Sequence, residues 1–138
     1  MSSPITKLYE AMKTVLHGAS SLVPSLVPAE NIRPGEDPSE PESGNMVFYN
    51  LNETKWDRKA RRGEGVMSLS VASVSNNVSA GQIMDVIRGL LTPRALTDAN
   101  VGIRVSMMKE SESYTDVGTT ASDRWLAATS FNWKLVEG

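Results

Sequence analysis

The hydrophobic and polar positions at the beginning of the chain predict an amphipathic helix. Ser3 suits the cap of this helix, Pro4 its first turn and Gly18 its end. The apolar residues recur every three or four positions, which places them on one helix face: Ile5, Leu8, Tyr9, Met12, Val15 and Leu16. His17 falls in the last turn, where we expect exposure or a contact with the helix terminus rather than a catalytic role.

A second helix is predicted after the middle of the chain. Ser79 suits its cap, because Gln82 follows three residues later as in a capping box, and Pro93 ends it. We expect Gly89 to mark close packing of this helix on a sheet. The predicted core face consists of five apolar residues: Ile83, Val86, Ile87, Leu90 and Leu91.

Four segments have the period of two, or the short apolar run, that is typical of strands. Segments 46–51 and 66–74 are expected to form an antiparallel pair, and the other two strands span 101–108 and 125–135. The resulting order, α-β-β-α-β-β, predicts an α+β fold. We expect a four-stranded, mostly antiparallel sheet with two helices on one face.

The second face of this sheet is expected to be partly apolar. In the third predicted strand, Met107 would face the helices and Met108 would lie on the opposite face. Residues Leu126, Ala128 and Val136 would join Met108 there. With seven methionines, Trp125 and Trp133, this surface and the two sheet edges predict self-association.

Composition fits a single domain, residues 1–138, with 40% hydrophobic and 22% charged residues. Five of the seven prolines lie between 24 and 42, within a predicted long connection at 19–45. This connection is acidic, since Arg33 is its only base. Its acidic residues are Glu30, Glu36, Asp37, Glu40 and Glu42.

The polar stretch 52–65 has the opposite charge and is too long for a tight turn, so it is expected to form a loop or a β-arm. Its basic residues surround an indole that we expect to be exposed: Lys55, Trp56, Arg58, Lys59, Arg61 and Arg62. Three interpretations remain open: a solvated arm, a surface for an acidic protein such as a second copy, and a patch that binds phosphates and stacks on a base.

The chemical inventory favours no enzyme. Cysteine is absent and histidine occurs once, so Cys-based metal sites and thiolate nucleophiles are excluded and a Ser-His-Asp triad is disfavoured. Phosphate-binding glycine loops are also missing. No catalytic, metal or cofactor residue is predicted. The net charge of −2 and the lack of a signal peptide or a long apolar run predict an untargeted soluble protein without a membrane contact.

Several stretches resemble the small tail-completion or tail-terminator proteins of long-tailed phages and related gene transfer agents. The resemblance spans most of the chain and rests on loose motifs: the helix ending near Leu16, the linker Ile32-Arg33-Pro34, the strands at Val47 to Tyr49 and Met67 to Val71, the helix with Val86 to Leu91, and a last strand introduced by Asp123-Arg124-Trp125. The linker is longer and more acidic, and the 55–62 loop more charged, than this family leads us to expect.

The resemblance implies a structural virion protein without cofactors. Such a protein forms a ring, typically a hexamer, at the head-proximal end of the tail tube, where it stops tube polymerisation and joins tail to head. Its partners would be copies of itself, the tail tube protein and the head-tail connector, with non-specific contact to passing DNA. It would assemble in the host cytoplasm and reside in the tail or neck of the virion. The alternatives are a head-completion or connector protein of the neck, and a small nucleic-acid-binding α+β module that uses the basic 55–62 loop.

Overall fold

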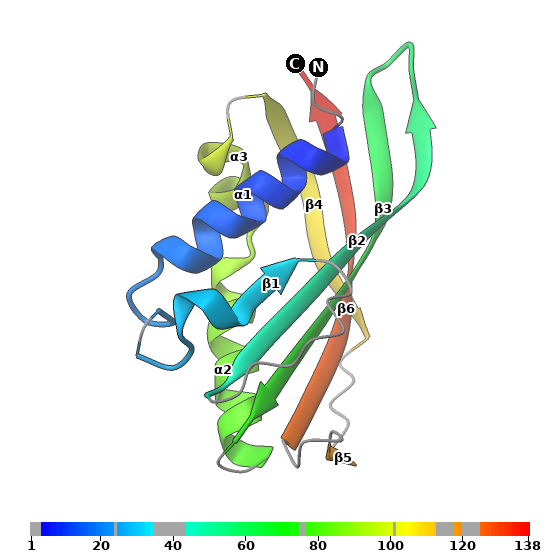
Figure 1. Ribbon diagram of the computed structural model, residues 1–138. Helices are drawn as coiled ribbons and strands as arrows, with labels where there is room; N and C mark the ends of the chain where they lie inside the picture. The colour runs from blue at the N-terminus through cyan, green and yellow to red at the C-terminus, as the bar shows by residue number, and fades with distance from the viewer. Residues whose placement is uncertain are drawn as a thin grey trace.

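Helices cover one face of a mixed, mostly antiparallel sheet, as the computed structural model shows (Figure 1). The structure describes residues 4–23, 25–34, 44–74, 77–100, 102–112, 118–119 and 125–138. The helices within these ranges are α1 (Pro4–Gly18), the short 3-10 helix η1 (Ala29–Asn31), α2 (Asn77–Leu90) and α3 (Pro93–Ala99).

Five strands form the described sheet in the order β1-β2-β3-β6-β4. Their bounds are β1 (Ile32–Pro34), β2 (Met46–Asp57), β3 (Arg62–Ser73), β4 (Ile103–Glu112) and β6 (Trp125–Glu137). A two-residue strand, β5 (Gly118–Thr119), also pairs with β6. All neighbours are antiparallel except β1 and β2, which are parallel. The α+β class is therefore confirmed, whereas the predicted strand count and order are wrong.

Two short elements account for most of this difference. Strand β1 has three residues and lies in the proline-rich connection, where it pairs through Ile32 opposite Val47. A strand of three residues is too short to show a periodicity in the sequence. Helix α3 begins at Pro93, which we expected only to end a helix. The Thr92 side chain accepts a hydrogen bond from the Ala95 amide at 3.1 Å, so Pro93 also occupies the first turn of a new capped helix.

Helix α2 begins at Asn77, so Ser79 lies inside the helix and the predicted cap is wrong. The core face is confirmed: Ile83, Ile87 and Leu91 are buried, while Val86 and Leu90 are partly buried against the core. The expectation for Gly89 is wrong, because this residue is exposed and a β-carbon there would meet nothing within 4 Å.

Strand β4 corrects the expected placement of its methionines. The register against β6 shifts between Val105 and Met107, which indicates a bulge. One extra residue in a strand reverses which face the following side chains occupy. Met108 is therefore buried in the core rather than on the opposite face, and Met107 is only partly buried.

Trp133 of β6 fills the core beneath the outer halves of β2 and β3. Its ring lies over Gly65, where an added β-carbon would come within 2.6 Å of the indole and 2.0 Å of the Asn52 carbonyl oxygen. Only a residue without a side chain fits this close approach. The glycine thus allows a fully buried tryptophan to anchor the base of the hairpin that β2 and β3 form.

Candidate assembly surface

The stretch 52–65 is a β-arm, the outer part of the β2–β3 hairpin. The two strands stay paired as far as Asp57 opposite Arg62, with one irregularity between Glu53 and Lys55. Figure 1 shows this arm at the upper right, at the end of the molecule where both chain termini lie. Of the two expected forms, a loop or a β-arm, the structure contains the arm.

The arm ends in a four-residue turn, 58–61, which we call the tip. The Asp57 carboxylate accepts hydrogen bonds from the amides of Lys59 and Ala60 at 3.0 and 3.2 Å, which closes the turn from within. Arg61 takes a left-handed conformation with φ of 53°. The Asp57 side chain is therefore engaged with the backbone of the turn.

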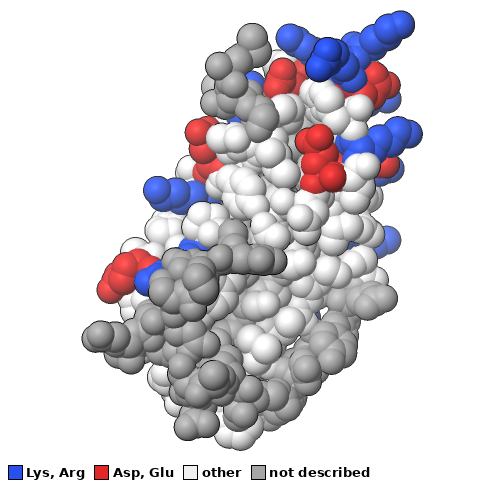
Figure 2. Space-filling view, turned by 45° about the vertical axis from the view of Figure 1, so that its right-hand side comes forward, with Lys and Arg blue, Asp and Glu red and all other residues white. Residues whose placement is uncertain are grey.

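The tip carries three exposed cationic side chains, those of Arg58, Lys59 and Arg61. None of them forms an ion pair with another residue in the described part of the chain. Figure 2 shows Lys and Arg side chains projecting from this upper end of the molecule. Positive charge is thus concentrated in the exposed turn between β2 and β3, where the Arg61 carbonyl accepts a hydrogen bond from the Glu137 amide of β6 at 2.8 Å.

Trp56 is not the exposed indole that we expected. It is partly buried against the core, and its ring lies 3.0 Å from the position that a β-carbon on Gly63 would take. Because the ring packs on this glycine, it anchors the arm and does not stand free to stack on a base. The aromatic component of a nucleic-acid patch is therefore missing from the arm.

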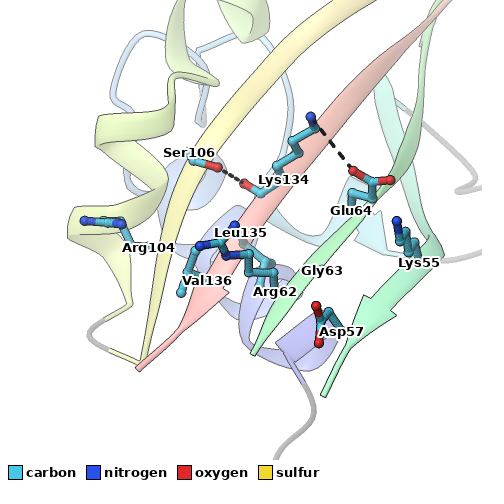
Figure 3. A pocket seen from close by; sticks show the side chains of 10 residues that line it. All are labelled: Lys55, Asp57, Arg62, Gly63, Glu64, Arg104, Ser106, Lys134, Leu135 and Val136. Carbon is cyan, nitrogen blue, oxygen red and sulfur yellow. Dashed lines mark hydrogen bonds and ion pairs between the residues drawn. The ribbon is translucent and has the colours of Figure 1, made fainter. Parts of the chain in front are cut away.

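A hollow of about 450 Å³ lies beside the outer part of the arm, on the sheet face that the helices leave uncovered (Figure 3). Lys134 Nζ lies 3.9 Å from Glu64 Oε2, and Figure 3 shows Arg62 beside Val136 on β6. Four cations and two acids contribute to its lining: Lys55, Arg62, Arg104, Lys134, Asp57 and Glu64. The lining is therefore polar, and its cationic residues outnumber its acidic residues by two.

The uncovered sheet face is partly apolar, as expected, because Leu126, Ala128 and Val136 alternate with the core-facing residues of β6, whereas Met108 is buried in the core. Val74 is the only exposed large hydrophobic residue among those described, and Trp133 is buried in the core. Leu126 and Val136 are partly buried. The centre of this face also carries polar residues, namely Asn50, Ser68, Ser130 and Asn132. Within the described residues, charge rather than apolar area distinguishes the surface.

The two long edges of the sheet are partly closed by side chains. On β2, the Tyr9 hydroxyl accepts a hydrogen bond from the Leu51 amide at 2.7 Å and donates one to Asn50 Oδ1 at 2.9 Å. On β4, Thr97 Oγ1 accepts from the Val105 amide at 2.9 Å. Beyond Leu51, the outer edge of the β2 half of the arm has no strand partner in the described structure. This stretch is the longest unpaired part of β2.

Glu36, Asp37 and Glu40, the predicted acidic counterpart, lie outside the described residues, in what we call the acidic segment, 35–43. The residues that flank this segment are described. At one end Pro34 pairs with Tyr49 of β2, and at the other Gly44 lies against Pro28 and Asn31.

Asn45 fixes the second end of the acidic segment. Its amide nitrogen donates to the Leu26 carbonyl at 2.9 Å, and its side-chain oxygen accepts from the Val74 amide at 3.0 Å. Asn31 Nδ2 in turn donates to the Asn45 carbonyl at 2.9 Å. Asn45 is therefore held where β2 begins, far from the tip. Sequence analysis missed these asparagines, because no pattern separates them from ordinary polar loop residues.

No protein-family model matches this chain, and no curated protein matches its sequence. In the described residues, no group of three or more His, Cys, Asp or Glu side chains is placed to hold a metal ion. No described helix combines the length and the apolar character that crossing a membrane requires. His17, in the last turn of α1, is partly buried.

Proposed function

We propose that this chain is a structural virion protein that forms a ring at the head-proximal end of a phage tail tube, where it terminates tube polymerisation and joins tail to head. The observation that carries this proposal is the arm, whose exposed tip, beside the end of β6, holds three cations without an ion-pair partner in the described part of the chain. An exposed, charged turn at one end of a subunit is suited to a head-to-tail contact with a neighbouring subunit, which is the kind of contact that forms rings.

Two features of the surface support an assembly role over a small-molecule role. The hollow is wide and lined by exposed charges of both signs, whereas ligand pockets are usually apolar with few polar groups. The unpaired outer edge of the arm offers backbone groups to a neighbouring chain. Both features favour contact with another protein surface. The tail tube protein and the head-tail connector are the proposed partners besides further copies.

Deletion of the gene in a particle-producing host tests this proposal most directly. A terminator is expected to leave tails of irregular, excessive length that lack heads, visible by electron microscopy, and the wild-type gene supplied in trans should restore uniform tails. Tails of normal length that fail to join heads would instead identify a connector. Normal, complete particles would contradict both roles.

Nucleic-acid binding is the second candidate, because the hollow and the tip together contain seven cationic residues: Lys55, Arg58, Lys59, Arg61, Arg62, Arg104 and Lys134. The packing of Trp56 against the core weighs against it. If several phosphates were bound, the affinity for duplex DNA would fall by about 10³ or more between 50 and 200 mM salt. We expect only weak DNA binding at both salt concentrations, measured by fluorescence anisotropy.

A further inference from the structure

We infer that the hollow beside the outer part of the arm binds carboxylate groups that an acidic stretch of a partner protein supplies. The inference deepens the proposed function, because it names the chemistry of a partner, and it rests on that function only for which protein the partner is. Three residues carry it: Arg62 of β3, Arg104 of β4 and, between them, Val136 of β6.

Strand register brings the two arginines to the same face of the sheet. Arg62 and Arg104 both pair with Val136, from the strands on either side of β6. Residues directly opposite each other in paired strands share a face, and neighbouring strands lie about 4.8 Å apart, so the backbones of the two arginines are about 10 Å apart. Figure 3 shows Arg62 and Arg104 on either side of Val136. Two guanidinium groups thus flank one apolar residue.

The acids of the hollow already have partners, whereas most of its cations do not. The Glu64 carboxylate lies 3.9 Å from Lys134 Nζ, and Asp57 accepts hydrogen bonds from two amides of the tip. Three exposed cations of the lining form no ion pair with another residue in the described part of the chain: Lys55, Arg62 and Arg104. The described residues therefore neutralise the positive charge of the hollow only in part.

Arginine side chains are well suited to hold carboxylates. The planar guanidinium group donates two parallel hydrogen bonds to the two oxygens of a carboxylate. In an extended peptide, residues two positions apart lie on one face about 7 Å from each other. Two acidic residues with that spacing match two long side chains whose backbones are about 10 Å apart. The volume of about 450 Å³ leaves room for a few side chains of such a peptide.

The pattern of charge in the lining favours a protein partner over a nucleic acid. Glu64 lies between Lys55 and Lys134 in one row across the sheet. Asp57 lies beside Arg62 in the next row. A nucleic-acid backbone is negative at every phosphate, so it would bring like charges against both acids. A protein stretch can instead place carboxylates opposite the arginines and neutral or basic side chains opposite the acids.

A peptide titration of the full chain tests the inference. The probe is a ten-residue peptide of alternating glutamate and serine, and the control peptide has glutamine in place of glutamate. Binding is followed by nuclear magnetic resonance at 50 mM salt, through the backbone amides and the arginine Nε–H groups, and the spectra of the free proteins verify folding.

Two double variants separate the site from the overall charge. The site variant carries Arg62→Gln and Arg104→Gln. The matched control variant carries Lys13→Gln and Arg94→Gln, which remove two exposed cations from α1 and α3 and change the net charge equally.

We expect the glutamate peptide to shift the resonances of Arg62 and Arg104 in the wild type and in the control variant. The site variant should bind this peptide about fivefold or more weakly, because it lacks both guanidinium groups. The glutamine peptide should leave these resonances unchanged. At 300 mM salt the affinity of the wild type should fall, since salt screens exposed charges.

Three results would overturn the inference: no shift at either arginine, a site variant that binds as tightly as the control variant, and shifts confined to the tip. A DNA duplex serves as the competing probe. If the duplex shifts both arginines where the glutamate peptide does not, the hollow belongs to nucleic acid instead.

The gene deletion described above reports on the proposed function separately. Binding of the glutamate peptide in the hollow, together with complete particles after deletion, would confirm the carboxylate site and contradict the role in the tail. Defective tails after deletion, together with a hollow that does not bind the peptide, would do the reverse.

Discussion

Arg88 of α2 and Glu110 of β4 form an ion pair in which Nε and Oε2 lie 2.9 Å apart. The same carboxylate oxygen accepts a hydrogen bond from the Thr129 hydroxyl of β6, and a second guanidinium nitrogen lies 2.8 Å from Asp85 Oδ1. Burial lowers the pKa of Arg88, but its hydrogen bonds to Glu110 and Asp85 and their charges outweigh this effect and raise the pKa. The pair thus ties a helix to two strands.

Replacing this carboxylate should destabilise the fold measurably. In Glu110→Ala, Arg88 and Thr129 both lose a partner in a site whose charged side chains are only about a quarter exposed, 26% and 23%. We expect a loss of about 1–2 kcal/mol in the free energy of unfolding, less than for a fully buried pair because solvent screens part of the interaction. Urea denaturation monitored by circular dichroism measures this loss.

Asp98→Ala is the matched control, because Asp98 is 73% exposed and lies 3.9 Å from Arg94, which is 94% exposed. Exposed pairs of this kind contribute little, so the control should change stability by less than about 0.5 kcal/mol. Equal losses in the two variants would show that burial does not strengthen the Arg88–Glu110 pair.

Substitution of alanine for Gly65 and for Gly89 should change the free energy of unfolding in opposite directions. In Gly65→Ala the new methyl group would lie 2.0 Å from the Asn52 carbonyl oxygen and 2.6 Å from Trp133, so the hairpin must distort. We expect a loss of about 3 kcal/mol or more. Gly89→Ala adds a methyl group to an exposed helical position with nothing within 4 Å, and should stabilise by about 0.5–1 kcal/mol.

Thermal unfolding followed by circular dichroism compares these two variants with the wild type. The comparison also tests the packing of the arm, because both the Asn52 carbonyl and the Trp133 ring leave no room for a side chain at Gly65. A Gly65→Ala protein as stable as the wild type would contradict the close approach of Asn52 and Trp133 to Gly65.

Elements long enough to show a period were predictable from sequence. The helices that contain Leu8 and Ile87 and the strand that contains Trp133 each bury one face over many residues, so apolar spacing alone identifies them. Strand β1 and helix α3 are too short for such a signal. Their existence depends on a parallel pairing and on a cap at Thr92, which periodicity does not reveal.

Charge was predictable from sequence, whereas the environment of single side chains was not. The cations of the arm are exposed as expected, because isolated charges are rarely buried. Trp56 and Met108 were misplaced for different reasons. Trp56 packs on a glycine of the neighbouring strand, and Met108 changes face at a bulge, and both effects depend on how strands pair in space.

The left-handed backbone of Arg61 offers a way to separate folding from assembly. A residue with a β-carbon at φ of 53° costs about 1 kcal/mol or more relative to glycine. Arg61→Gly should therefore raise the free energy of unfolding by about 0.5–1 kcal/mol while it removes one cation from the tip. Chemical denaturation should show a more stable protein, and light scattering a weaker association.

The comparison variant is Arg58→Gly, which removes a neighbouring tip cation at a position without a positive φ. It should weaken association to a similar extent without the gain in stability. If Arg61→Gly were no more stable than Arg58→Gly, the turn would not hold Arg61 in the left-handed conformation.

The ionisation of the Tyr49 hydroxyl should lower the free energy of unfolding at alkaline pH. Burial, and to a lesser extent the charge of the neighbouring Tyr9, raise the pKa of its hydroxyl to about 12 from about 10. The folded protein therefore holds this proton more tightly than the unfolded chain, so the stabilising effect is complete below pH 10 and is lost as pH rises from 10 toward 12. The total loss is up to about 2.7 kcal/mol, since each pKa unit corresponds to about 1.36 kcal/mol.

Tyr49→Phe isolates this effect, because every other group that titrates above pH 10 is common to both proteins. The Tyr49 hydroxyl is buried and has no hydrogen-bond partner among the described residues, so the variant should be as stable as the wild type at pH 7, or more stable. The two stability curves, measured by urea denaturation, should then diverge above pH 10, with the phenylalanine variant losing less. Parallel curves up to pH 12 would mean that the Tyr49 hydroxyl is reached by solvent in the folded protein.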